Sequence, residues 1–189
     1  ITLEKDASSW LQRDIINISS ARVQSVSYVS PKGSKVDVEK AAGEESDFVV
    51  TNIPEGRELS YDAIGNTIAS AVSYVKLDDV LPDGSITFEP ESTYRSTFSI
   101  NNGLEVLAHT TKVEGKAYIK FSIDSLANVE GEASNTANNN DVENLSSEDE
   151  AAQLNTRVSG WVFQISDYAY GSFTKEMSDI LKSEDKPAT

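Results

Sequence analysis

The 189-residue chain contains no cysteine and has few basic residues. Without cysteine it forms no disulfide, no thiolate zinc site and no cysteine nucleophile. Only 16 lysines and arginines accompany 31 aspartates and glutamates, so the net charge is −15. Nucleic acids and anionic membranes bind basic surfaces, so we expect neither as a partner through charge. No apolar run reaches the length of about 18 residues that a membrane-spanning helix requires.

The motifs of common enzymes are missing as well. No phosphate-binding glycine loop is present, and no serine lies in the Gly-x-Ser-x-Gly pattern of an esterase nucleophile. The single histidine, His109, lies in a segment where Leu104, Val106 and Ala108 alternate, which places it on the opposite strand face. A catalytic or metal-binding histidine needs partners, so we interpret His109 as an ordinary strand residue. Because the acidic loops also miss the spacing of a calcium loop, we predict no enzyme activity, cofactor or metal.

The first half of the chain shows three strand patterns followed by a helix pattern. Apolar residues alternate with polar ones in 21–30, 35–40 and 47–53, which predicts three strands. Short turns join these strands, so we expect an antiparallel meander. Apolar residues then recur at helical spacing, which predicts one helix over 59–77 with Ser60 as its N-cap.

The second half follows the same order with one additional strand and an insertion. Strands are predicted at 92–100, 104–113, 116–124 and 160–166, with an Asn-Gly turn between the first two. A helix with one apolar stripe then begins at Ser166 or Asp167. Residues 126–155 contain no lysine, arginine or aromatic residue. We predict a disordered acidic insertion there, with a short capped helix after Ser146.

The sequence thus predicts an α+β fold of two antiparallel β-meander-plus-helix units, at 1–82 and 83–189. The stretches "SDFVVTNIP" (46–54) and "SGWVFQISD" (159–167) occupy the same place in these units, directly before the helix. An internal duplication explains the repeated order, and chance recurrence of a common supersecondary order is the alternative. In either case each sheet has one apolar face, which one helix must cover.

Aromatic residues gather towards the C-terminus. We assign Trp161 and Phe163 to the core, because they alternate with polar or smaller residues along a strand. Trp10 and Trp161 are predicted to be structural, and Trp161→Ala is expected to cost about 3–5 kcal/mol. Tyr168 and Tyr170 fit no apolar stripe, so we predict that they contact a ligand or a partner. The alternative for the whole cluster is a groove for a sugar or a peptide.

Two stretches carry a family pattern. The first, "WLQRDIINISSARVQSVSYVSPKG", contains the residues Trp10, Leu11, Arg13, Ile18, Arg22, Val23, Val26 and Gly33. The second, "LNTRVSGWVFQISDY", places Asn-x-Arg shortly before Trp-apolar-aromatic-x-Ile-x-x-Tyr. Together they make nearly the whole chain resemble the bacterial domain-of-unknown-function family 4340. The chain differs from this family at Ser166, where proline is frequent, and in its Asn-rich acidic loop.

The resemblance implies a function but no catalytic residues. Members of the family carry one N-terminal transmembrane helix and an extracytoplasmic domain, and they are auxiliary components of gliding-motility-type ABC transporters. We therefore expect a non-enzymatic domain on the periplasmic face of the inner membrane, anchored by a helix upstream of Ile1. Its expected partners are the membrane subunits of the transporter. A periplasmic domain that binds a small ligand or a glycan is the alternative, and an enzyme is a third hypothesis.

Overall fold

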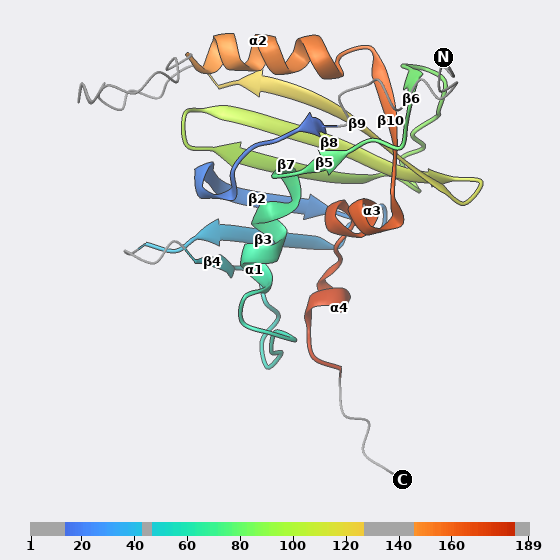
Figure 1. Ribbon diagram of the computed structural model, residues 1–189. Helices are drawn as coiled ribbons and strands as arrows, with labels where there is room; N and C mark the ends of the chain where they lie inside the picture. Colours follow the sequence, from blue (N-terminus) through green and yellow to red (C-terminus); the bar gives the residue numbers. More distant parts are fainter. Residues whose placement is uncertain (1–13, 43–46, 127–145, 184–189) are drawn as a thin grey trace, which may run out of the picture.

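The computed structural model describes residues 14–42, 47–126 and 146–183. All strand pairs in these ranges are antiparallel and the helices are short, so the α+β class is confirmed. Figure 1 shows one large sheet, with α1 and α3 in front of it and α2 along its upper edge. Trp10 and residues 127–145 of the predicted insertion lie outside the described residues.

The first half of the chain forms the predicted meander. Its elements are β1 (Asp14–Ile16), η2 (Ser20–Arg22), β2 (Val23–Val29), β3 (Lys35–Lys40) and β4 (Phe48–Val50). β2 pairs with β3 and β3 pairs with β4, as the alternating pattern indicates. Val26 and Val38 are opposite each other in this register and both are buried, so the apolar sides of β2 and β3 form one face.

The helix predicted over 59–77 is much shorter in the structure. The segment contains α1 (Ile64–Ala69), η3 (Ser70–Val72) and β5 (Val75–Lys76), and β6 (Asp79–Pro82) follows it. The predicted N-cap Ser60 is wrong, since the N-cap is Ala63, which makes no side-chain capping bond. α1 is positioned by packing instead, because a Cβ atom at Gly65 would collide with the carbonyl oxygen of Phe48. The chain then leaves the helix to pair β5 with β1, and this tertiary pairing overrides the helical spacing.

The second half contains the longest strands. Its elements are β7 (Tyr94–Ile100), β8 (Leu104–Val113), β9 (Lys116–Ser125), α2 (Ser147–Val158), β10 (Trp161–Ile165), α3 (Asp167–Phe173) and α4 (Met177–Ile180). The C-terminal helix is therefore split, and Glu176 and Asp179 form a capping box that begins α4.

The predicted insertion is shorter than expected. Residues 147–155 belong to α2, so disorder as far as residue 155 is wrong. The short helix predicted after Ser146 is confirmed, and the Ser146 side chain accepts a hydrogen bond from the backbone N–H of Asp149. Acidic residues occupy the first turn of α2 and Arg157 the last turn, which suits the helix dipole at both ends.

The two halves share a single sheet, whereas two separate sheets were expected. The strand order is β4-β3-β2-β7-β8-β9-β10-β6, and β1 and β5 form a second, two-stranded sheet. β2 of the first half pairs with β7 of the second half over most of its length. Both strands are apolar on one face, so joining them produces one continuous apolar face instead of two smaller ones. The expectation of one sheet and one covering helix per unit is therefore not confirmed.

The covered face of the sheet is filled by a row of aromatic rings. Tyr28, Phe98, Phe173 and Phe121 are buried, and Phe173 of α3 lies 5.9 Å from the ring centroids of both Phe98 and Phe121. The Tyr28 hydroxyl donates a 2.7 Å hydrogen bond to the carbonyl oxygen of Ser172, and burial raises the pKa of Tyr28. These contacts hold α3 over the centre of the sheet.

The opposite face of the sheet is crossed by the segment 83–93. This segment connects β6, at the sheet edge beside β10, to β7 in the centre, so it passes over β10, β9 and β8. Phe88 in this segment lies 4.9 Å from the Lys120 ammonium. Tyr118 and Val162 face the same side and are buried. Thr111 of β8, opposite Tyr118, is buried as well, whereas the other outward side chains of β7 and β8 are at most partly covered; this face is called the open face below.

Candidate functional site

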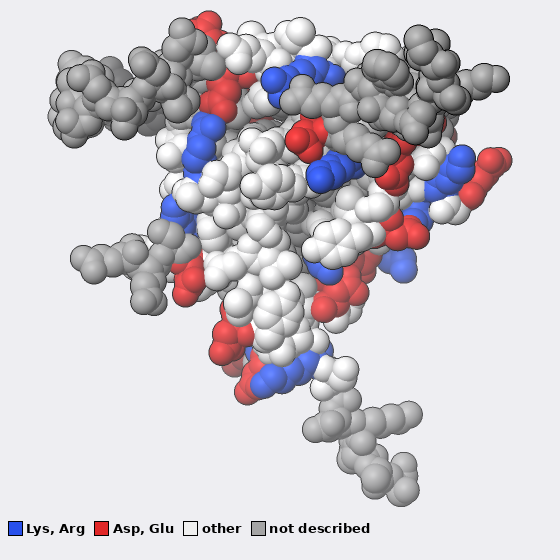
Figure 2. Space-filling model, in the orientation of Figure 1, with Lys and Arg blue, Asp and Glu red and all other residues white. Residues whose placement is uncertain are grey.

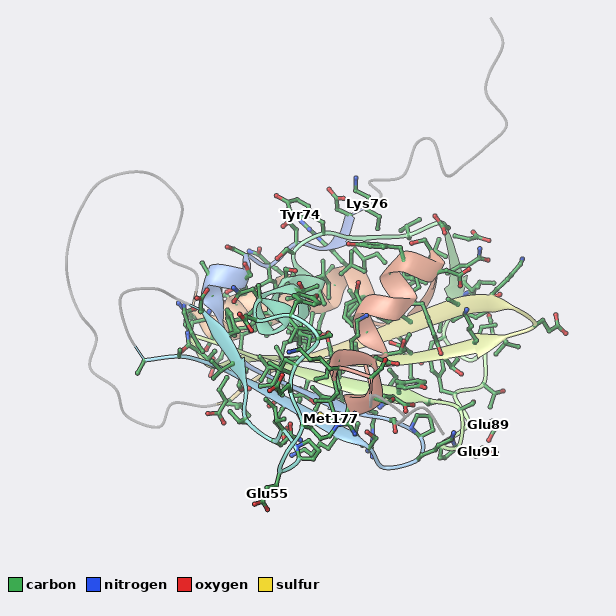
Figure 3. The ribbon with its side chains drawn as sticks, turned by 90° about the horizontal axis from the view of Figure 1, so that it is seen from below. Glu55, Tyr74, Lys76, Glu89, Glu91 and Met177 are labelled. Atoms are coloured by element: carbon green, nitrogen blue, oxygen red, sulfur yellow. The ribbon has the colours of Figure 1, made fainter. Side chains whose placement is uncertain are left out.

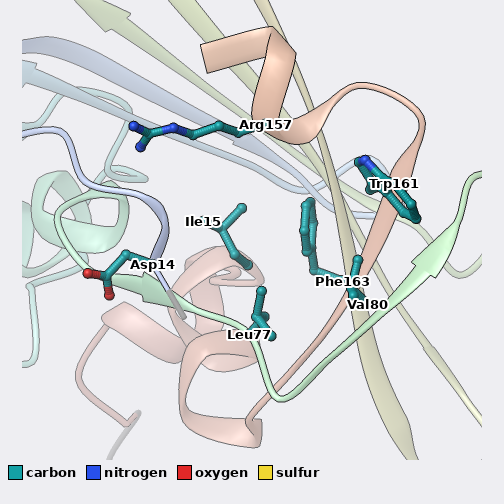
Figure 4. A pocket seen from close by; sticks show the side chains of 7 residues that line it. All are labelled: Asp14, Ile15, Leu77, Val80, Arg157, Trp161 and Phe163. Carbon is teal, nitrogen blue, oxygen red and sulfur yellow. The ribbon is translucent and has the colours of Figure 1, made fainter. Parts of the chain in front are cut away.

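The most distinctive concave site lies around Trp161, at the start of β10. The described residues that line this pocket are Asp14, Ile15, Leu77, Val80, Arg157, Trp161 and Phe163, and its volume is about 360 Å³ (Figure 4). They come from β1, the β5–β6 connection, β6, the last turn of α2, and β10. The site is therefore assembled from three distant parts of the chain.

Backbone pairing fixes the floor of this pocket. β10 pairs with β6, which places Phe163 opposite Val80. Two further backbone bonds extend the pairing, from Asp78 N–H to the Gln164 carbonyl and from Asp83 N–H to the Gly160 carbonyl, each 2.8 Å long. Gly160 has φ +79°, a conformation that suits glycine, and it turns the chain from α2 directly into Trp161.

Trp161 is not a core residue, so the sequence-based assignment is wrong. Its side chain is 42 % exposed, whereas Phe163, two residues later on the same strand, is 4 % exposed. Alternation correctly predicts that both residues lie on one strand face, since both line the pocket. The difference arises because Trp161 is the first residue of β10, where the covering layer ends. Trp161→Ala is accordingly expected to cost less than a core deletion.

The pocket has an apolar body and one charged end. Figure 4 shows Trp161 at one end, with Phe163, Val80, Leu77 and Ile15 across the middle. The guanidinium of Arg157 and the carboxylate of Asp14 lie at the other end, with Arg157 above Asp14 in this view (Figure 4). Neither group forms an ion pair with another described residue. This arrangement can hold an apolar or ring-shaped group against Trp161 and hydrogen-bond a polar group at the far end.

Tyr168 and Tyr170, the predicted contact residues, lie apart from this pocket on α3. Tyr168 is 88 % exposed. Tyr170 is half-buried: its ring lies 6.3 Å from that of Tyr94, and the Lys112 ammonium lies 4.7 Å above it. Burial is the main cause that raises the pKa of Tyr170. The two tyrosines thus face different surroundings, and their role as contact residues stays a prediction.

Sequence reasoning missed most of the pocket. Asp14 lies in a segment without a predicted element, Leu77 ends the helix predicted over 59–77, and Val80 lies in a four-residue edge strand that was not predicted. Arg157 carried the one available signal, since it belongs to the Asn-x-Arg motif that precedes Trp161. That motif was interpreted as structural, and Arg157 was not proposed as a site residue.

Two further features are missing among the described residues. No group of three or more histidine, cysteine, aspartate or glutamate side chains there is arranged to hold a metal ion. No helix within the described ranges is long and apolar enough to cross a membrane.

Comparison with known proteins does not assign the chain to a family. No protein-family model, curated protein or solved structure matches it. The resemblance to the domain-of-unknown-function family 4340 therefore stays a hypothesis.

Proposed function

We propose that this domain binds a small amphipathic ligand in the pocket beneath Trp161. The observation that carries the proposal is the exposed indole above a pocket whose floor is apolar and whose far end is charged. A pocket of about 360 Å³ lies within the usual range for small-molecule sites. Exposing a tryptophan costs hydrophobic stabilisation, which a stacked ligand would recover.

The lining residues define the class of ligand. The flat indole and the Phe163 ring suit a molecule with an apolar face, such as an aromatic ring or the less polar face of a sugar. Arg157 and Asp14 supply donors and an acceptor at one end, so the ligand carries a polar group there. Small-ligand and glycan binding, the alternative hypothesis from the sequence, both fall in this class.

The test uses energy transfer from Trp161 to a bound naphthalene probe. A Trp10→Phe background leaves Trp161 as the only indole, and the neutral probe is N-phenyl-1-naphthylamine. Saturable energy transfer is expected, and the probe's own fluorescence enhancement should be lost in Trp161→Ala. Tyr168→Ser is the matched control, because it removes an exposed aromatic ring outside the pocket and should bind the probe normally.

The charged end is tested with a second probe, 1-anilinonaphthalene-8-sulfonate. Arg157→Gln should weaken binding of this anion and leave the neutral probe unaffected. An oligosaccharide panel titrated into the same Trp10→Phe protein separates glycans from other ligands, since stacking a sugar changes the Trp161 emission. Unchanged probe binding in Trp161→Ala, with cooperative unfolding retained, would rule out this pocket as the binding site.

We propose as a second candidate that the domain assists an ABC transporter by protein–protein contact outside the cytoplasm. Figure 2 supports a contact surface on the helical side: the area over α1 is largely free of charged side chains, which gather at the margins and around β5. Tyr74, on this side in Figure 3, is 74 % exposed, and Tyr61 beside α1 is also exposed. The uncharged surface is unusual for a chain with a net charge of −15.

Membrane fractionation and crosslinking test this second candidate. The full-length protein is expected in the membrane fraction and to be cut by protease added to spheroplasts. A photo-crosslinker at Tyr74 or Tyr168 should then capture a transporter subunit, whereas one at Lys116, the first residue of β9, should not. Recovery in the cytosolic fraction would exclude the transporter hypothesis and leave the ligand-binding proposal intact.

We infer, finally, that the sheet arose by an internal duplication. The duplicated units differ from the two that the sequence predicted. The units β2-β3-β4-α1 and β7-β8-β9-α2 meet at the antiparallel β2–β7 pair, so β3 corresponds to β8 and β4 to β9. This order supports a pseudo-twofold arrangement. In this arrangement β4 corresponds to β9, and β10 is an addition. The order of predicted elements in the sequence had instead matched β4 with β10.

A further inference from the structure

Three basic side chains lie in one row across the open face. Arg95 of β7 is opposite His109 of β8, and His109 is opposite Lys120 of β9. Directly opposed residues on adjacent strands point to the same side, about 4.5–5.5 Å apart. Like charges in such positions are destabilising, so the row has an energetic cost whenever His109 is protonated.

No carboxylate neutralises this row among the residues that the structure describes. Neither Arg95 nor Lys120 forms an ion pair there, and Lys120 instead lies over the Phe88 ring. Partial burial, followed by the charges of Lys120 and Arg95, lowers the pKa of His109. In a chain with 31 acidic residues, a row of three basic groups without a counter-charge needs an explanation.

The crossing segment 83–93 contains three acidic residues. Asp83 lines the hollow beside Lys120. Glu89 and Glu91 flank Pro90, and Figure 3 shows them on the side of the sheet away from Tyr74 and Lys76, extending outward. None of the three lies within ion-pair distance of Arg95, His109 or Lys120.

Two hollows meet at His109. One, of about 430 Å³, is lined by Arg95, His109, Phe88, Thr93 and the turn at Ser30–Gly33. The other, of about 410 Å³, is lined by His109, Lys120, Ser122 and the turn before Trp161. The basic row therefore borders open space on both sides of the imidazole, and hydroxyl groups at Ser30 and Ser122 add further donors.

We propose that Arg95, His109 and Lys120 form a binding site for a small divalent oxyanion, a phosphate-like group or a pair of carboxylates. The anion offsets the repulsion within the row and accepts charge-assisted hydrogen bonds from Arg95 and Lys120. It also favours the imidazolium form of His109, so binding takes up a proton and is tighter at acidic than at alkaline pH. None of these three residues lines the pocket beneath Trp161, although Trp161 also borders one of the two hollows.

The single histidine makes the test direct, because its imidazole gives one set of NMR signals. His109 is titrated with pH in chloride and then in sulfate at equal ionic strength, since sulfate stays divalent throughout. The pKa of His109 should rise saturably with sulfate, beyond the screening effect of chloride. Inorganic phosphate and citrate, added at fixed pH, then distinguish phosphate-like from carboxylate ligands. Identical pKa values in chloride and sulfate would overturn the proposal.

Variants assign the effect to the row. Lys120→Gln and Arg95→Gln should each weaken sulfate binding about tenfold, the loss typical of one charge-assisted bond. Lys120→Arg keeps the charge and should restore binding. Lys116→Gln is the matched control, because it removes the same charge from the same face of β9, about 13 Å along the strand. Equal weakening in Lys116→Gln would show a general charge effect and refute a site, and thermal unfolding of each variant verifies that it is folded.

Discussion

The two faces of the β7-β8-β9 sheet use the same strands for different purposes. On the covered face Phe98, Val106 and Ile123 are opposite one another and buried beneath the helices. On the open face, three residues away on each of these strands, Arg95, His109 and Lys120 form a basic row. Alternation alone separates an apolar interior from a charged surface only a few ångströms away.

This difference shows where stability and binding reside. Side chains of the covered face contribute through packing, and most of them have no room for a ligand. Side chains of the open face and of the sheet's ends contribute little to packing, so they can take unfavourable positions. Trp161 and the basic row are both such cases: an exposed indole, and an imidazole between two cations.

The largest loss of stability is expected for Phe173→Ala, on the covered face. This change empties a fully buried ring site that contacts Phe98 and Phe121, and it should lower the free energy of unfolding by about 3–5 kcal/mol. Leu107→Ala on the open face is the control and should cost about 1 kcal/mol or less. Urea unfolding followed by circular dichroism measures both, and equal losses would break the distinction between the faces.

A smaller effect on stability is expected for the ion pair between Arg22 and Glu150. Arg22 donates two 2.7 Å hydrogen bonds to Glu150 of α2, and Asn102 donates a third at 2.8 Å. Arg22 is the main cause that lowers the pKa of Glu150 from 4.5. Glu150→Gln should lower the free energy of unfolding by about 1–3 kcal/mol at pH 7.

The pH dependence of this pair has a definite sign. Because the folded-state pKa of Glu150 is lowered, its contribution is present above the ordinary pKa of 4.5 and is lost as pH falls through the folded value. The difference between the wild type and Glu150→Gln should therefore shrink in acid. Glu58→Gln, which removes an exposed ion pair with Lys182, is the control and should show almost no difference at any pH. A Glu150→Gln difference independent of pH would contradict the role of the charge.

Strand faces could be predicted from the sequence because they depend on neighbouring residues. β3 and β8 match the predicted ranges at both ends, and His109 lies on the predicted face. The helix over 59–77 failed because the pairing of β5 with β1, a contact with a remote segment, decides where α1 ends. The prediction of two separate sheets failed for the same reason, since no local pattern specifies that β2 pairs with β7.

The candidate sites were less predictable than the fold. Alternation places Trp161 on the correct strand face but does not say whether anything covers the end of β10. The pocket also needs Asp14 and Val80, which reach it only through the order of strands in the sheet. The basic row is invisible in the sequence, because Arg95, His109 and Lys120 become neighbours only when the register of two hairpins is known.

Thr110→Val, on the covered face, should stabilise the protein. This gain is expected to be smaller than the losses predicted for Phe173→Ala and Glu150→Gln. The Thr110 side chain is fully buried, and its hydroxyl has no hydrogen-bond partner among the described residues. Replacing it by a methyl group of similar size removes an unsatisfied polar atom and should raise the free energy of unfolding by about 1 kcal/mol. Thr97→Val on the open face should leave it unchanged. Loss of stability in Thr110→Val would show that a buried water satisfies the hydroxyl.

The smallest effect is expected for His109→Gln, and its sign depends on pH. The pKa of His109 is lowered in the folded state, so the unfolded state binds a proton more readily. Protonation therefore reduces stability progressively as pH falls from the ordinary value of 6.5 through the folded value. His109→Gln removes this penalty, so the variant should match the wild type within about 0.5 kcal/mol at pH 8 and exceed it in acid. Urea unfolding across this range measures the difference, and in sulfate it should diminish, because a bound anion stabilises the imidazolium. A variant less stable than the wild type in acid would mean that the open face already neutralises His109 within the protein.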